Sequence, residues 1–148
     1  MAVLIAEEIR RALGALSAER FVITSAHDGK RAGVLATSVS MCAPDPPLVC
    51  VACRKGHVIG PVIRDSRRFG VFRVEEADRA ALKKFDFENG ERYEAFEGIP
   101  LDHFVTGSPI PRRAAMALDC ELFRRIDLEC ECELYIGLVV AARVGRVG

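Results

Sequence analysis

Small hydroxyl side chains gather where a strand-like segment ends, in the run Ala36, Thr37, Ser38 and Val39. Small residues let the backbone approach a flat ring closely, and hydroxyl groups can hydrogen-bond the polar edge of that ring. A rigid, proline-rich turn follows at residues 44–47, before an apolar segment begins. The residue types favour a ligand-binding strand end, although Thr-Ser pairs at such positions are often only turns.

Basic side chains follow the next apolar segment, residues 48–53. Arg54, Lys55 and His57 come in quick succession, with Gly56 among them. Cationic side chains just before a helix N-terminus can bind a phosphate group. The alternative interpretation is a solvated corner of the surface, and the residues alone leave both open.

Six cysteines are the other reactive residues, at positions 42, 50, 53, 120, 130 and 132. Cys50 and Cys53 have the spacing of a redox pair, but residues three apart on a strand point to opposite faces. We therefore interpret them as small core residues, with the redox pair as the alternative. Cys130 and Cys132 would share a strand face, but a zinc site needs two more ligands, and the sequence offers no second close pair. The sequence predicts no metal site.

Length and charge restrict the class of protein. At 148 residues, a single domain over residues 1–148 is expected. The formal net charge is +0, so the sequence predicts no nucleic-acid partner and no anionic membrane surface. No apolar run approaches the ~18 residues of a membrane span, and charged residues interrupt the N-terminal apolar stretch early. We expect a cytoplasmic protein with reduced thiols.

Hydrophobic periodicity predicts a mainly β (α+β) protein. Strands are expected over residues 20–26, 31–40, 48–53 and 69–74, and in two alternating segments within 114–128 and 130–136. On the last segment, Cys132 and its alternate neighbours are predicted to face the core, and Glu129, Glu131 and Glu133 the solvent. In segment 114–128, Asp119 and Glu121 are expected opposite the apolar face.

Helices and turns complete the pattern. Helices are expected over residues 3–16, 56–66 and 75–85, the second starting late or kinked at Pro61. Turns are expected at Asp28-Gly29 and Asn89-Gly90, a rigid loop at the prolines, and mostly loop over 91–111. Short connections between strands favour an antiparallel split β-barrel with a few peripheral helices. Glycine-rich phosphate loops of the doubly wound folds are absent from the sequence.

The ordered set of segments resembles the flavin reductase-like family, the FMN-binding split barrels. Residues 36–40 and the following Asp-Pro-Pro-Leu-Val are similar to the family's Thr-Ala-Ser-Ser-Phe and Asp-Pro-Pro-Leu-Val. Four later segments resemble the family in the same order, at residues 63–72, 107–110, 118–120 and 134–139. The resemblance covers residues 21–139.

The resemblance implies a bound FMN and assigns its contacts. Ala36, Thr37, Ser38 and Val39 match the flavin-contacting run, and Cys53, Arg54, Lys55 and His57 match the phosphate-side loop. The family loop often reads Arg-Ser-Ser-x-Thr, so two hydroxyl donors are missing here and one cation is gained. We expect phosphate binding through a different set of contacts.

One departure from the family concerns activity. Many of its reductases carry Gly-Asp-His before the last strand, where this chain has Cys130, Glu131 and Cys132. Hydride transfer depends chiefly on how the two cofactors are aligned, so loss of the histidine need not abolish it. It does weaken the case for efficient use of NADH or NADPH, and the sequence assigns no catalytic residue.

Two functions follow from the resemblance. The first is an NAD(P)H-dependent flavin reductase that passes hydride to FMN and serves a flavin-dependent oxygenase or an electron-transfer partner. The alternative is a non-enzymatic FMN-binding electron-transfer protein, and a third reading is a scaffold that binds no flavin.

A homodimer with flavin sites near the subunit boundary is expected, because the first helix and the strand near residues 134–140 offer apolar faces that one small barrel does not cover.

Overall fold

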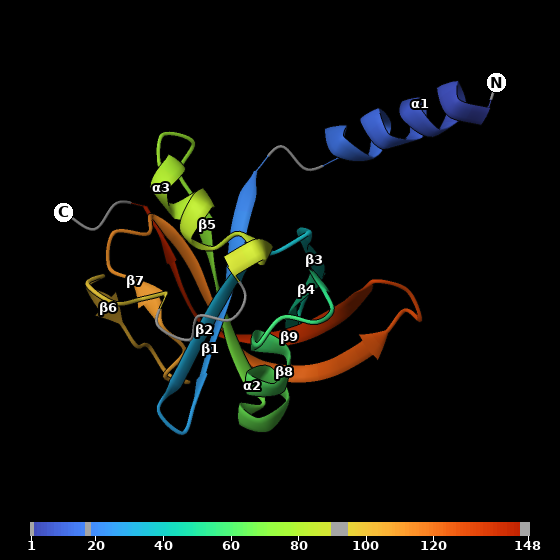
Figure 1. Ribbon diagram of the computed structural model, residues 1–148. Helices are drawn as coiled ribbons and strands as arrows, with labels where there is room; N and C mark the ends of the chain where they lie inside the picture. Colours follow the sequence, from blue (N-terminus) through green and yellow to red (C-terminus); the bar gives the residue numbers. More distant parts are fainter. Residues whose placement is uncertain (1, 17–18, 90–94, 146–148) are drawn as a thin grey trace.

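A seven-stranded antiparallel sheet forms the body of the protein in the computed structural model, which describes residues 2–16, 19–89 and 95–145 (Figure 1). The strand order is β2-β1-β5-β8-β9-β4-β3, and β6 and β7 form a separate two-stranded ribbon. The elements run α1 Ala2–Ala15, β1 Arg20–His27, β2 Lys30–Leu35, β3 Ser38–Pro44, β4 Pro47–Arg54, α2 Ile59–Ser66, β5 Arg68–Val74, α3 Arg79–Lys84, the short 3₁₀ helix η1 Phe87–Asn89, β6 Leu101–Asp102, β7 Ile110–Pro111, β8 Met116–Asp127 and β9 Cys132–Val144. The predicted mainly β, antiparallel class is confirmed.

The chain itself closes the sheet into a barrel between its two edge strands. Strand β2 pairs with β1, whereas β3 pairs with β4 on the opposite edge of the sheet. At the crossing, the Ala36 amide donates to the Phe21 carbonyl at 2.9 Å, and the Thr37 amide donates to the Ala52 carbonyl at 2.8 Å. The prediction of one strand over 31–40 is therefore wrong, because the hydrogen-bond partner changes at Ala36 and Thr37.

Hairpin turns join the strands at both edges. Asp28 and Gly29 have φ angles of 49° and 77°, which confirms the predicted β1–β2 turn. The predicted rigid turn at the proline cluster is a tight one at residues 45–46, but Pro44 and Pro47 are paired strand ends and not part of a loop. Pro44 is tolerated because β3 lies at the sheet edge, and Pro47 because it is the first residue of β4, where the pairing with β9 has not yet begun.

The helices differ in length from the prediction. Helix α2 begins at Ile59, later than residue 56, and Pro61 falls in its first turn, where a missing amide costs little. Helix α3 is shorter than the predicted 75–85 because Asp78 caps it, its carboxylate accepting from the Ala81 amide at 3.0 Å. The predicted loop 91–111 contains β6 and β7, while residues 90–94, including Gly90 of the predicted Asn89-Gly90 turn, lie outside the described residues.

Two groups of buried side chains form the core. One fills the barrel around Ile23, Val51, Phe69 and Tyr135, where Ile59 and Ile63 of α2 also pack. The other packs Phe72, Phe85 and Phe96 beneath α3 and β7. Helix α2 thus plugs one end of the barrel and fixes the loop that leads into it.

Asp119 contradicts the predicted solvent-facing side of β8. Its side chain is fully buried and accepts from the amides of Val105 and Thr106, each at 2.8 Å, and from the Thr106 hydroxyl at 2.5 Å. A bulge between Asp119 and Cys120 interrupts the alternation. The buried carboxylate therefore fixes the loop before β7.

Helix α1 projects away from the barrel, as Figure 1 shows in blue. It is amphipathic as predicted, but Ile9 and Leu13 are 53% and 60% exposed, and Leu16, just after the helix, is 82% exposed. Among the described residues, no helix has the length and apolar character to cross a membrane.

Candidate functional site

The predicted ligand-contacting run lies where β3 begins, beside the end of β4. Thr37 and Ser38 are exposed, and Ser38 pairs with Ala52 of β4. Ala36 and Val39 are half-buried and pack against the core, so their side chains support the strand. The run therefore exposes two hydroxyl groups, those of Thr37 and Ser38, between residues that pack against the core.

Strand β4 separates the predicted phosphate-side residues onto two faces. Val49, Val51 and Cys53 are buried inside the barrel, whereas Ala52 and Arg54 face outward with Ser38. Burial raises the pKa of Cys53 well above its usual range, which identifies a core thiol. Cys50 and Cys53 lie on opposite faces as expected from the strand period, and neither they nor the other cysteines form a disulfide.

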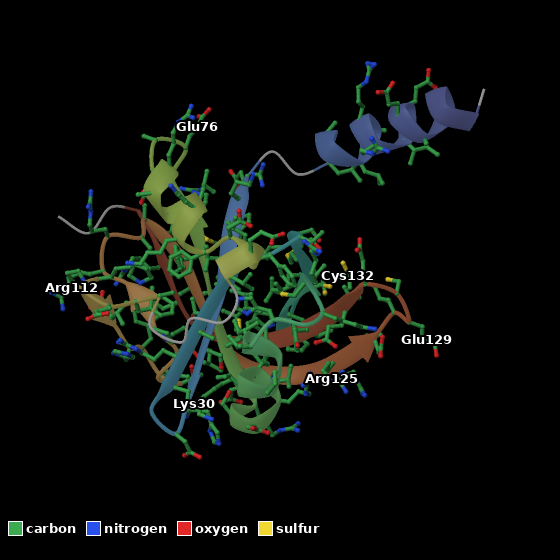
Figure 2. The ribbon with its side chains drawn as sticks, in the orientation of Figure 1. Lys30, Glu76, Arg112, Arg125, Glu129 and Cys132 are labelled. Atoms are coloured by element: carbon green, nitrogen blue, oxygen red, sulfur yellow. The ribbon has the colours of Figure 1, made fainter. Side chains whose placement is uncertain are left out.

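Strand β9 completes the outward face. Ala52 pairs with Leu134 and Arg54 pairs with Cys132, and the Cys132 Sγ lies 4.0 Å from the Thr37 Oγ1. Figure 2 labels Cys132 near the start of this strand. The prediction that Cys132 packs in the core is wrong, because it stands beside the predicted ligand-contacting run.

Glu133 takes the buried position that the sequence pattern assigned to Cys132. It is 5% exposed, and Arg125 and Arg64 approach its carboxylate at 3.1 and 3.7 Å. Tyr135 also donates its hydroxyl to Glu133, and burial together with this bond raises the Tyr135 pKa. Two cations and a hydroxyl compensate the buried carboxylate, so the acidic residues of the alternating segment do not all face solvent.

A cavity of about 500 Å³ opens at this end of the barrel. Its walls come from the end of β4, the loop that follows, the first turn of α2, and both strands of the β8–β9 hairpin. Four of the predicted residues line it: Cys53, Arg54, Lys55 and His57. The sequence missed Arg64, Asp127, Glu133 and Tyr135, since they come from distant segments and have no spacing that would connect them.

The two predicted cations are held by different partners. Lys55 forms an ion pair with Asp127, which raises the pKa of Lys55 and lowers that of Asp127. The Arg54 guanidinium lies 4.2 Å from the centre of the Phe87 ring. Arg54 keeps its charge exposed on the outward face, so it is the cation better placed beside Ser38.

His57 brings no positive charge to the site. It is 6% exposed, and its Nδ1 accepts from the Ile59 amide at 3.0 Å. Burial lowers its pKa to about 4, so the ring is neutral near pH 7, with its proton on Nε2. His57 therefore orders the start of α2 and can offer a ligand only a neutral donor.

The family model described as the flavin reductase like domain matches residues 13–147. The chain belongs to this family. A ferric-chelate reductase (NAD(P)H) of Archaeoglobus fulgidus is 25% identical over 126 residues, covering 84% of this chain and 74% of the relative. An FMN reductase (NADH) RutF of Rhizobium rhizogenes is 27% identical over 116 residues, covering 78% of this chain and 66% of the relative.

Solved structures share the fold of this flavin reductase-like chain. A nitrilotriacetate monooxygenase component B homologue from Mycobacterium thermoresistibile superposes with a TM-score of 0.81 at 24% identity, covering 99% of this chain and 79% of that one. A flavoredoxin from Methanosarcina acetivorans gives 0.77 at 16% identity, covering 85% and 68%. The protein is thus a flavin reductase-like, flavin-binding protein with the split-barrel fold.

The residues of the outward face suit a flavin. Ser38 and Ala52 carry small side chains where a flat ring must approach the backbone, and Thr37 adds a hydroxyl. Arg54 stands at the end of the same face and can pair with an anion. An apolar wall, hydroxyl groups and a cation are the three features that a ring with a phosphorylated side chain requires.

Proposed function

We propose that the chain binds FMN against Ala36, Thr37, Ser38 and Val39 and reduces it with NADH or NADPH. The observation that carries the proposal is the β3–β4 register, which sets Ser38 beside Ala52, two residues before Arg54. The ring lies on the hydroxyl-bearing strand end, and the phosphate lies toward Arg54 and Lys55. Relatives named as NAD(P)H- and NADH-dependent reductases support this assignment.

The flavin, when bound, supplies the hydride-accepting chemistry. The work of the protein is to bind and orient. Thr37 and Ser38 hold the ring edge by hydrogen bonds, and β4 and β9 form the wall behind it. Since alignment of the two rings dominates the rate, the outward face must stay open to the nicotinamide on one side.

A second copy of the chain would cover the rest of the outward face. Leu134 and Ile136 of β9 are only half-buried there, and Ile126 of β8 is 41% exposed. Strands β8 and β9 extend beyond the barrel (orange and red in Figure 1), which adds to this surface. We propose a two-fold homodimer with each flavin near the subunit boundary.

Electrons from the reduced flavin would pass to another protein. One similar structure is that of a homologue of nitrilotriacetate monooxygenase component B. By analogy we propose a flavin-dependent oxygenase or an electron-transfer partner as the acceptor.

A non-enzymatic electron carrier is the second candidate, and Cys132 favours it. This residue stands where many reductases of the family have a histidine, and it lies 4.0 Å from Thr37. A carrier would bind FMN and accept electrons from a partner protein while ignoring nicotinamide.

Anaerobic addition of NADH or NADPH to the FMN-loaded protein separates the candidates. If the protein is a reductase, the nicotinamide bleaches the absorbance of the bound flavin without air. In air, the protein then oxidises excess nicotinamide catalytically. Flavin that stays oxidised with both nicotinamides, but bleaches with dithionite, identifies the carrier. A protein that stays colourless with added FMN is the scaffold and refutes both.

A further inference from the structure

Two thiols meet on the outward side of the β3–β4 hairpin. A bulge interrupts the register between Met41 and Ala43, and Cys42 is the residue that the bulge adds. Ser40 of β3 pairs with Cys50 of β4. Cys42 lies two residues after Ser40 on β3, so it stands diagonally across from Cys50. Burial raises the pKa of Cys50, and the nearby Cys42 thiol raises it further. Cys42 is exposed, Cys50 is half-buried, and both are free.

We propose that Cys42 and Cys50 are a modification site, which a hydroperoxide such as hydrogen peroxide converts to a disulfide. The exposed Cys42 sulfur attacks one peroxide oxygen, and the O–O bond breaks. Water is released, and Cys42 becomes a sulfenic acid. The Cys50 sulfur then attacks Cys42, the S–O bond breaks, and a second water carries away the remaining thiol proton. Two thiols and one peroxide thus give one disulfide and two waters.

The position of the pair allows the bond to form. Strand β3 lies at the edge of the sheet, so only one neighbour restrains it. A bulge already breaks its ladder beside Cys42, and the proposal requires that backbone shifts at this bulge bring the two sulfurs to bonding geometry.

The other thiols are less suitable. Cys53 and Cys120 are 1% and 0% exposed, and Cys53 lies on the opposite face of β4 from Cys50. The Cys130 sulfur faces the Cys132 carbonyl oxygen at 3.8 Å rather than a second sulfur. Figure 2 draws sulfur atoms in yellow on the side of the molecule that carries β3, β4 and Cys132.

Peroxide would arise beside this pair if the protein reduces flavin, since reduced flavin that meets dioxygen yields hydrogen peroxide. That source rests on the proposed function, whereas formation of the bond does not. The experiment therefore adds hydrogen peroxide directly to the flavin-free full chain. Failure of the proposed function then leaves the outcome unaffected.

Digestion after Arg31 and Arg54 and before Asp45 separates the two cysteines into fragments 32–44 and 45–54. After peroxide treatment and alkylation, we expect the two fragments joined by a disulfide that reductant cleaves. Cys42→Ser and Cys50→Ser must each abolish the joined species, and the matched control Cys130→Ser must leave its yield unchanged. Far-ultraviolet circular dichroism checks that each variant folds.

Three results would overturn the proposal. One is accumulation of Cys42 sulfinic acid while Cys50 remains alkylated. Another is a joined species that persists in Cys50→Ser, since Cys53 would then be the partner. The third is a disulfide that contains Cys130 or Cys132 in place of this pair.

Discussion

Arg54 and Lys55 follow one another in sequence but face different surroundings. Lys55 already pairs with Asp127, while Arg54 lies over the face of Phe87 and keeps its charge exposed. A phosphate near Ser38 would therefore meet Arg54 without first breaking an ion pair. From this difference we propose that Arg54, rather than Lys55, determines a preference for a phosphorylated flavin.

We predict that the protein binds FMN more tightly than riboflavin and that Arg54→Ala removes most of the difference. One charge-assisted pair contributes about 1.5–3 kcal/mol, which is roughly a tenfold to hundredfold change in affinity. Titration of both flavins against intact protein, Arg54→Ala and the exposed control Arg113→Ala measures it. Equal affinities of the intact protein for the two flavins would remove the phosphate role.

His57 links the same loop to the stability of the fold. Its native pKa is about 4, below the ordinary value of 6.5, because burial disfavours the charged ring. Above about pH 6.5 the ring is neutral in both the native and the unfolded state, so His57 does not lower the stability. As pH falls from 6.5 toward 4, the unfolded chain binds a proton at His57 more readily than the native protein does. The direction is a loss of stability on acidification.

We predict that His57→Asn flattens this part of the pH profile. The asparagine oxygen can still accept from the Ile59 amide, but it does not titrate. Between pH 6.5 and 4 the intact protein should lose about 1–3 kcal/mol more unfolding free energy than the variant. Urea unfolding at several pH values measures this, and parallel profiles for the two proteins would contradict it.

At the scale of elements, strand β9 determines which residues the site contains. The alternation over 130–136 was visible in the sequence, but its phase was not, because both faces carry apolar or compensated side chains. Arg64 and Arg125 make burial of Glu133 tolerable, and these partners come from α2 and β8. The alternation of a strand can be read from its own residues. Which of its two faces is buried depends on the side chains that distant elements place against it.

Because Glu133 and Tyr135 face the core, the alternate residues Leu134 and Ile136 of β9 face outward, beside Ile126 of β8. We predict that a second copy covers these outward residues, so Ile136→Glu should shift the protein from dimer to monomer. Val144→Glu is the matched control, since Val144 lies on the same strand and is already 88% exposed. Sedimentation equilibrium at micromolar protein distinguishes the species, and a strictly monomeric intact protein that still holds FMN tightly would refute the dimer.

At the scale of the whole molecule, the sequence predicted the class of fold and most strands. Short turns and β-branched runs are local, which is why β1, β4 and β5 appeared nearly at their true bounds. The barrel closure did not appear, because it depends on Ala36 and Thr37 changing partners between two sheet edges. The cavity also escaped prediction, since residues from four separate elements form its walls.

Binding of FMN by the strand end at Thr37 and Ser38 is the central claim. Titration of FMN, followed by quenching of its fluorescence, should show saturable binding to the intact protein. Thr37→Leu combined with Ser38→Leu should abolish that quenching without lowering the urea midpoint of unfolding. Ala80→Leu on α3, an exposed residue remote from β3, should bind normally. Unchanged FMN affinity in the doubly substituted, folded protein would contradict the account and place the flavin elsewhere.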